Sequence, residues 1–424
     1  MKKLGSIFNK SKKDAGFILA LDIGTEFVKS LVFKVDEENQ KGIVVGVGKA
    51  KQKIGNMTSG AVSDINGVIQ TCSDSIEKAK EQAGIDEVSD CIIGIAGEFV
   101  KGTTTTVHYE RAKPQVRIDM PELKNIVQKI QWKALERIRN QLSFETGHSD
   151  IDVKLINAAV VGIKIDGYKV TKPIGFQGRE VSIAIFNAYA PMIHLGAIET
   201  IAKELGLKLL SIAAEPYAVV QGMGLEEDPD FGGIFIDIGG GTTDIAVVKN
   251  GGLEGTSMFA LGGRAFTKRL CSEYGLSFNK AEELKLMYSK GELEEDEAQE
   301  VHKVLKNDCK VWLSGVEIAL ENFCYSKLDV LPSRVLLCGG GSGLPDVYEQ
   351  LNSDYWLERL PFAKKPKIGF VQPRDMVHII DQTKSLTNPQ DVTPIGLATL
   401  ALEINDKDNI MSDVLKRAVK IIQN

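Results

Sequence analysis

The feature that most constrains this chain is a glycine turn that occurs twice, each time between two apolar strands. The first copy reads LALDIGT at residues 19–25, and the second reads IFIDIGGGTTDIAVV at residues 234–248. In both copies an apolar strand ends in Asp-Ile-Gly, turns, and returns as an alternating strand. Asp22 and Asp237 occupy matching positions, so the pattern predicts two related α/β halves.

Length and composition agree with more than one globular domain. The chain has 424 residues, whereas single cores stop growing at roughly 250–300 residues. Apolar residues make up 43% and charged residues 25%, which is ordinary for a globular protein. The net charge of −6 argues against nucleic acid as a partner, and we find no apolar run of the ~20 residues needed to span a bilayer.

The glycine turns are suited to binding phosphate. Glycine lets backbone N–H groups approach an anion closely, and a third glycine-rich loop, Gly339–Gly343, follows an apolar strand. An acid at a strand end is costly to bury unless it faces a cation, which for Mg²⁺ is usually contacted through water. Asp22 and Asp237 therefore predict Mg²⁺ on a triphosphate held between the two turns.

These segments resemble the motifs of the actin-like ATPase superfamily. LALDIGT and IFIDIGGGTTDIAVV resemble its two phosphate motifs, and LLCGGGSGLP (336–345) resembles its adenosine motif. AAEPYAVVQGMG (213–224) and TPIGLATLAL (393–402) resemble its two connecting helices. The resemblance implies an α/β fold in which two duplicated RNase H-like domains enclose a cleft for ATP and Mg²⁺.

The resemblance also implies a role for individual residues. Asp22 and Asp237 would be the acids associated with Mg²⁺, and Glu215 would orient the attacking water; the alternative for Glu215 is an acid at a helix N-terminus. Phosphates would lie along Gly24, Thr25, Gly239, Gly240, Gly241, Thr242 and Thr243, and adenosine along Gly339, Gly340, Gly341 and Ser342.

Two further groups of polar residues are candidates. Glu282, Lys285 and Ser289 share one helical face in a segment that resembles the helix contacting ribose, and the alternative is a solvated, salt-bridged face. Glu26 departs from the family pattern, because a carboxylate follows the first phosphate turn. We expect Glu26 to point away from the nucleotide and Lys29 to face the phosphates.

The position of an inserted segment is similar to that in the FtsA family of cell-division proteins. KPIGFQGREVSIAI (172–185) resembles a stretch of that family, with Lys172 in place of the usual Asn, and ALGGRAFTKRL (260–270) resembles its next subdomain. The implied first core is residues 15–97, continued at 187–230 and 385–424, and the second core is 231–257, continued at 328–384. An inserted α+β subdomain of the 1C or SHS2 type would span 98–186, a nucleotide-capping subdomain 258–327, and a basic tail 1–14.

The resemblance implies an ATP-binding protein that forms filaments and links FtsZ to the membrane, with slow Mg²⁺-dependent ATP hydrolysis. The alternative is a PilM-like protein of a pilus or secretion machine, which binds a short peptide of an inner-membrane partner. A metabolic kinase of the same superfamily is a third hypothesis, but we find neither its sugar-binding insertion nor its catalytic base.

Both ends of the chain carry basic, amphipathic patterns. The first 13 residues include five lysines, and they are either a membrane-surface segment or a solvated tail. Residues 410–422 show apolar side chains at helical spacing, typical of a last helix packed on the body or of a membrane-surface helix. Six cysteines without a C-x-x-C pair indicate a reducing compartment. We therefore expect a cytoplasmic protein, peripheral on the inner face of the membrane.

Overall fold

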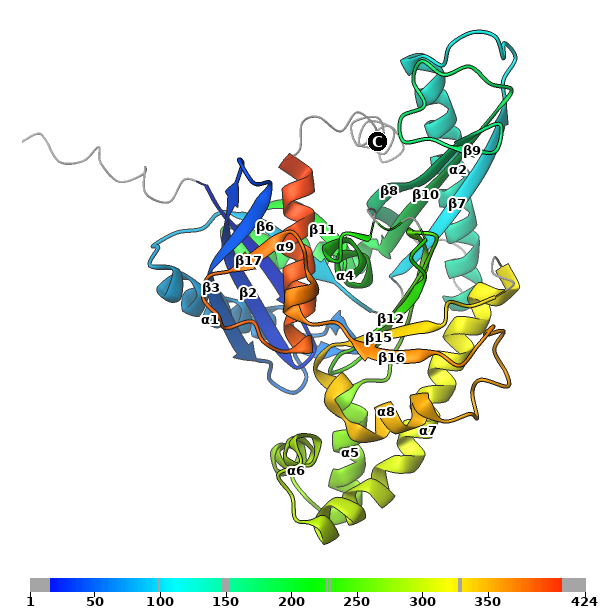
Figure 1. Ribbon diagram of the computed structural model, residues 1–424. Helices are drawn as coiled ribbons and strands as arrows, with labels where there is room; N and C mark the ends of the chain where they lie inside the picture. The colour runs from blue at the N-terminus through cyan, green and yellow to red at the C-terminus, as the bar shows by residue number, and fades with distance from the viewer. Residues whose placement is uncertain are drawn as a thin grey trace, which may run out of the picture.

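The computed structural model describes residues 16–97, 100–146, 152–225, 228, 230–326 and 330–405. The basic N-terminal segment and the predicted C-terminal helix lie outside these residues. Two sheets dominate the described part, and helices cover their faces, which confirms the predicted α/β class (Figure 1). Within the described part, no helix is long and apolar enough to cross a membrane.

The first sheet is built around the first glycine turn. Strands β1 (Phe17–Ile23) and β2 (Phe27–Asp36) form the hairpin, and β6 (Asp90–Ile95) runs parallel to β1. The strand order is β11-β6-β1-β2-β3-β17. The remaining strands are β3 (Lys41–Lys51), β11 (Lys208–Ala214) and β17 (Ile379–Asp381).

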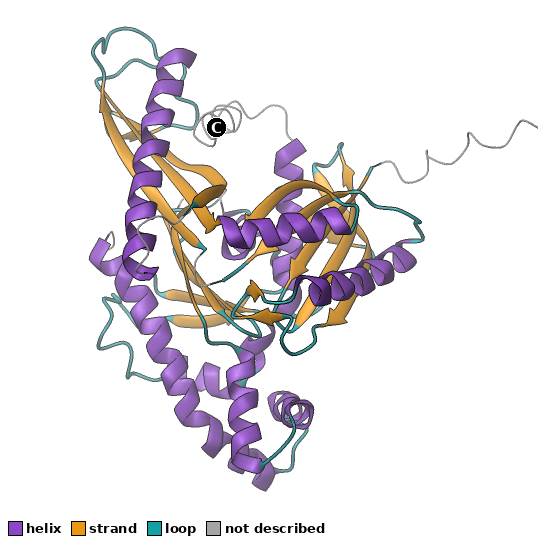
Figure 2. Cartoon of the chain, turned by 180° about the vertical axis from the view of Figure 1, so that it is seen from behind, coloured by secondary structure: helices purple, strands orange, loops and turns teal. Residues whose placement is uncertain are grey.

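Helices pack on both faces of this sheet. Helix α1 (Ile65–Ala83) packs on β2 and β3, and α3 (Met192–Glu204) lies beside it (Figure 2). On the opposite face, α9 (Val392–Asn405) packs against β1. The sheet is therefore buried on both sides, which explains its continuous apolar strands.

The second sheet repeats the hairpin arrangement. Strands β12 (Gly233–Ile238) and β13 (Thr243–Lys249) form the second hairpin, and β15 (Arg334–Cys338) runs parallel to β12, as β6 does to β1. Strands β14 (Gly252–Phe259) and β16 (Lys367–Phe370) flank these strands. The duplication read from the sequence is thus present in the strand topology.

The inserted segment extends the second sheet. Strand β7 (Lys101–Glu110) pairs with β14 through Thr103–Gly255 and Gly102–Thr256, so that β10, β8 and β9 continue the sheet beyond it. Helix α2 (Met120–Thr146) packs on this extension, which projects from the body in Figure 1. The other strands are β8 (Val153–Ile165), β9 (Tyr168–Lys169) and β10 (Glu180–Pro191). Strand β10 runs through residue 186, where the inserted subdomain was predicted to end. The bounds of that subdomain stay a prediction.

A helical layer covers the second hairpin. It consists of α5 (Gly263–Tyr274), α6 (Phe278–Lys290), α7 (Glu295–Ser326) and α8 (Pro345–Asn352), at the bottom of Figure 1. The first turn of α7 contains three acids, Glu295, Asp296 and Glu297. Carboxylates are stabilised there by the positive end of the helix dipole. Trp312 of α7 is fully buried against the second sheet.

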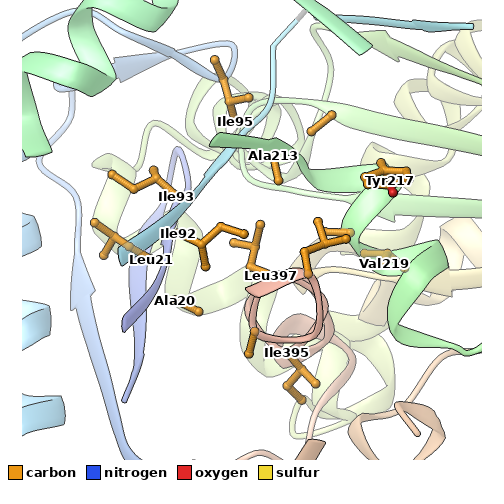
Figure 3. Close-up of a cluster of buried hydrophobic side chains, with 14 of the residues drawn as sticks. Ala20, Leu21, Ile92, Ile93, Ile95, Ala213, Tyr217, Val219, Ile395 and Leu397 are labelled. Atoms are coloured by element: carbon orange, nitrogen blue, oxygen red, sulfur yellow. The ribbon is translucent and has the colours of Figure 1, made fainter. Parts of the chain in front are cut away.

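Two helices cross between the halves. Helix α4 (Glu215–Gly222) and α9 approach so closely that a side chain at Gly396 would overlap the carbonyl oxygen of Ala218. Figure 3 shows Leu397 of α9 and Val219 of α4 in one cluster with Leu21 of β1. These are the two segments whose sequences resemble connecting helices.

A glycine pair in β3 allows the close packing of α1. Side chains at Gly46 and Gly48 would overlap the carbonyl oxygens of Ala79 and Ser75 in α1. We expect Gly48→Ala to lower the free energy of unfolding by about 1–3 kcal/mol, as overpacking does, in urea denaturation. Gly369→Ala is the control, because its added carbon would meet Leu336 at an ordinary 3.5 Å. Equal stability of the two variants would contradict this packing.

Candidate functional site

A cleft with a volume of about 1150 Å³ lies where the two hairpin turns, the glycine loop after β15 and helices α5 and α6 meet. Both halves of the chain contribute to its wall. Most of the residues predicted from the sequence line it: Asp22, Gly24, Thr25, Lys29, Glu215, Asp237, Gly239, Gly240, Thr242, Glu282, Lys285, Ser289, Gly339, Gly340 and Gly341.

Three predicted residues do not line the cleft, although each supports its wall. A side chain at Gly241 would lie 2.7 Å from Thr25 Oγ1, so Gly241 is where the two turns touch. Thr243 Oγ1 donates to the Leu261 carbonyl at 2.7 Å and accepts from Trp312 Nε1 at 2.9 Å. Ser342 Oγ donates to the Gly339 carbonyl at 2.7 Å and so closes the glycine loop on itself.

The two turns have matching hydrogen bonds. Gly24 donates its N–H to Phe27 at 3.1 Å, and Gly239 donates its N–H to Thr242 at 2.9 Å. The Gly239 and Gly240 carbonyls accept from the N–H groups of Gly263 and Arg264 at 2.9 and 2.8 Å. The start of α5 therefore holds the second turn in place.

Buried carboxylates gather in the cleft. Asp22 accepts a hydrogen bond from Lys29 Nζ at 3.0 Å, and Asp237 Oδ2 accepts from Thr393 Oγ1 at 2.5 Å. Glu215 Oε1 and Asp244 Oδ1 are buried and have no hydrogen-bond partner within the described residues. Burying such atoms without a partner costs free energy, and in the cleft they are available to a bound ligand.

Burial dominates the titration of these acids. It raises the pKa of Glu215 well above the usual range, and the charges of Asp22 and Asp244 add to the effect. Burial and the charge of Asp237 likewise raise the pKa of Asp244, and burial raises that of Asp237. A cation placed among these groups would reverse the shifts.

Lys29 lines the cleft as the counter-ion of Asp22. Burial opposes its charge, but Asp22, together with Asp237 and Asp391, more than offsets this, so the pKa of Lys29 is raised. Its charged amine is therefore part of the cleft wall, within reach of an anion bound there.

The expectation that Glu26 points away from the cleft is wrong. Glu26 lines it, because Arg264 Nε donates to Glu26 Oε2 at 2.7 Å, and Lys51 Nζ lies 3.5 Å from the other oxygen. The two cations offset the carboxylate charge beside the first turn. The sequence could not show the pairing of Glu26 with Arg264, since these two residues are 238 positions apart.

The alternative of a solvated face on α6 does not hold. Lys285 is only 9% exposed, and its Nζ donates to the Gly263 carbonyl at 3.0 Å and to Thr267 Oγ1 at 2.8 Å. Its amine also contacts Glu282 Oε2 at 2.8 Å. This face of α6 is thereby tied to the start of α5 and completes the cleft wall.

Sequence reasoning missed several residues of the cleft. Asp244, Arg264, Gln390 and Thr393 line it, and three of them stand inside segments that the motifs already marked. The motifs do not show which of their side chains point into the cleft. Thr393 is the clearest case, because it lies in the connecting helix yet bonds to Asp237 across the site.

The acids suit a hydrated cation better than a fully protein-bound one. Among the described residues, no group of three or more His, Cys, Asp or Glu side chains is placed to hold a metal ion directly. Mg²⁺ keeps several waters and is bound through few carboxylates together with substrate phosphates. The unpartnered oxygens of Glu215 and Asp244, with Asp22 and Asp237 beside them, fit that mode.

Comparisons with known proteins agree with this geometry. A family model described as "Cell division protein FtsA" matches residues 234–396, and one described as "MreB/Mbl protein" matches residues 168–297. FtsA of Streptococcus pneumoniae is 26% identical over 384 residues, covering 86% of this chain and 79% of the relative. FtsA of Enterococcus hirae is 24% identical over 435 residues, covering 95% and 93%.

A solved structure shows the same fold. The "PilM-PilN type IV pilus biogenesis complex" superposes with a TM-score of 0.63 at 17% identity, over 91% of this chain and 98% of that one. The chain is similar in sequence to FtsA proteins and has the actin-like ATPase fold. The suspected resemblance and the fold are thereby confirmed, and the chain carries its cleft where its two halves meet.

The raised pKa of Glu215 predicts a pH-dependent cost to stability. A carboxyl with a raised folded pKa binds more protons when folded, so stability falls as the pH rises above its ordinary value of 4.5 toward the raised value. We expect Glu215→Gln to stabilise the nucleotide-free protein at pH 8, because the neutral amide removes the cost of burying an ionised carboxylate. The gain should vanish near pH 4.5 in thermal unfolding.

The exposed Glu199 of α3 provides the control. Glu199 Oε1 lies 3.6 Å from Lys154 Nζ in an exposed ion pair, so Glu199→Gln should leave the pH profile unchanged. A Glu215→Gln variant less stable than the parent at pH 8 would contradict the conclusion that the buried Glu215 carboxylate destabilises the fold.

Proposed function

We propose that the cleft binds Mg·ATP. The observation that carries this proposal is the convergence of two equivalent glycine turns, from opposite halves, on one cleft with unpartnered carboxylates. The phosphates would lie along the turns at Gly24 and Gly239–Gly241. The adenosine would lie between α6, with Glu282, Lys285 and Ser289, and the loop at Gly339–Ser342.

We propose slow ATP hydrolysis with Glu215 as the residue that orients water. Glu215 starts α4 at the cleft wall, and its free Oε1 can accept a hydrogen bond from a water molecule. Bound Mg²⁺, associated with Asp22 and Asp237, would supply positive charge that offsets charge on the phosphates. The same positive charge would return Glu215 and Asp244 to their ionised forms.

We propose that the protein acts in cell division as an FtsA-like adaptor at the septum. It would form filaments and link FtsZ, through its C-terminal peptide, to other division proteins at the cytoplasmic face of the membrane. The FtsA family model and the FtsA relatives support this role over the PilM-like alternative. The PilM likeness, at 17% identity, concerns the fold alone.

Membrane contact would come from an end of the chain. The five lysines within residues 1–13 and the amphipathic pattern of residues 410–422 are the two candidates. Either segment would act as a peripheral anchor. Its binding to anionic lipid would place the rest of the chain, which would link FtsZ, at the membrane surface.

The nucleotide site is tested by Asp237→Asn. Removing this buried charge should weaken Mg·ATP binding by at least about tenfold in calorimetry, because an interaction with a charged group contributes about 1.5–3 kcal/mol. Thr393 can still donate to the amide oxygen, so the fold should persist. Asp308→Asn, on α7, is the control with a carboxylate outside the cleft. Unchanged affinity in Asp237→Asn would mean that the cleft is not the nucleotide site.

The division role is tested on anionic vesicles. With Mg·ATP, the full chain should co-sediment with vesicles and retain FtsZ, and a variant lacking residues 1–13 or residues 408–424 should lose vesicle binding. An FtsZ without its C-terminal tail is the control. A protein that binds ATP but stays in the supernatant and ignores FtsZ would overturn the adaptor role while leaving the nucleotide site intact.

A further inference from the structure

An ion pair joins the two walls of the cleft. Arg264, the second residue of α5, belongs to the second half, whereas Glu26 belongs to the turn after β1 in the first half. Their 2.7 Å contact lies inside the cleft wall, and each side chain is only 13% exposed. The pair therefore links the first phosphate turn to the helix that holds the second one.

The backbone around this pair is tightly placed. The N–H of Arg264 donates to the Gly240 carbonyl at 2.8 Å, so its position follows the second turn. A side chain at Gly240 would lie 2.9 Å from Glu26 Cβ, so the two turns are in direct contact here. Arg264 thus stands at the point where the phosphate turns of both halves meet.

The guanidinium of Arg264 has an unused donor. Its Nε is taken by Glu26, and its Nη1 reaches the Met57 carbonyl only at 3.4 Å. Its Nη2 is buried and has no partner within the described residues. A buried donor without an acceptor costs free energy, and the cleft that Arg264 lines is the place from which an acceptor would come.

The pairing with Arg264 changes the effect that Glu26 has on an anion in the cleft. Next to a phosphate turn, an unpaired carboxylate would repel an anion. Paired with Arg264, it instead fixes one edge of a planar group that carries five N–H donors, leaving the other edge free. Arginine is suited to such double contacts with carboxylate and phosphate.

The position of the pair points to the far end of the nucleotide. The proposed adenosine wall, α6 and the Gly339–Gly343 loop, belongs to the second half. A nucleotide anchored there would reach toward the first half with the end of its phosphate chain, and would meet the pair of Glu26 and Arg264 at the boundary between the halves.

We propose that Arg264 binds the terminal phosphate of a nucleoside triphosphate through Nη2, with Glu26 as the positioning residue that holds the guanidinium. This inference rests on the proposed nucleotide binding. A diphosphate lacks the group that Arg264 contacts, so the residue makes the cleft distinguish ATP from ADP. Only the triphosphate completes the link between the two turns.

The test measures the affinities of the full chain for Mg·ATP and Mg·ADP by calorimetry. Arg264→Gln should weaken ATP binding by about tenfold or more, since a charge-assisted hydrogen bond is lost, and ADP binding by no more than about twofold. Arg269→Gln is the matched control on the same helix, because its partner Asp308 lies 3.3 Å away outside the cleft. Arg264→Lys keeps the charge without the planar fork and should recover part of the ATP preference.

A double-mutant cycle tests the role of Glu26. Glu26→Ala should weaken ATP binding less than Arg264→Gln does, and the double variant should bind no more weakly than Arg264→Gln alone, because the two residues act as one unit. The ratio of ATP to ADP affinity is the main readout, since a general loss of folded protein lowers both affinities together. Circular dichroism of each variant confirms that the fold is retained.

The outcomes separate this inference from the function on which it rests. Equal losses for ATP and ADP would show that Arg264 merely ties the halves together, and unchanged affinities would remove it from the site. Either result overturns the inference while nucleotide binding stands. A parent protein that binds neither nucleotide would overturn both. A selective loss of ATP affinity in Arg264→Gln, absent from Arg269→Gln, supports the terminal-phosphate contact.

Discussion

Buried carboxylates at the ends of equivalent strands are the constraint around which the rest of this molecule is arranged. Asp22 ends β1 and Asp237 ends β12, so the duplicated hairpin brings one acid from each half to the same cleft. Asp22 accepts a hydrogen bond from Lys29 of β2, and Asp237 accepts one from Thr393 of α9. Within the described residues, Glu215 Oε1 has no hydrogen-bond partner, so the fold holds an unfavourable cluster of acids that protonation or a bound cation would relieve.

The two crossing helices couple this cluster to the contact between the halves. Glu215 is the first residue of α4, and Thr393 lies in the first turn of α9. Further along, the same helices pack so closely at Gly396 and Ala218 that no side chain fits between them. A shift of one half against the other must therefore move backbone that carries site residues, which ties the geometry of the acids to the angle between the halves.

Much of the fold and of the site follows from local sequence, and the rest does not, for a physical reason. The paired hairpins of β1 and β2 and of β12 and β13 were predicted, because each apolar strand, glycine turn and returning strand is written in adjacent residues. The glycine turns were found because phosphate chemistry demands them at one spacing. The Glu26–Arg264 pair and the join of β7 to β14 escaped prediction, since each depends on long-range packing that no local pattern encodes. The domain boundaries and the role of each site residue stay predictions.

The cleft is a feature that the proposed division role shares with the pilus alternative. Its turns, acids and connecting helices are features of a whole superfamily of nucleotide-binding folds, so they are equally compatible with a filament-forming adaptor and with a peptide-binding module. What differs between such proteins must lie where the common core leaves freedom: in the strands β7–β10 that extend the second sheet and in surfaces that meet a partner. The match to FtsA of Enterococcus hirae covers 95% of the chain and so includes this extension as well as the core. The PilM structure also covers 91% of the chain, but at 17% identity it shows the fold alone. The sequence similarity to FtsA relatives, rather than the chemistry of the cleft, is therefore what supports the proposed division role.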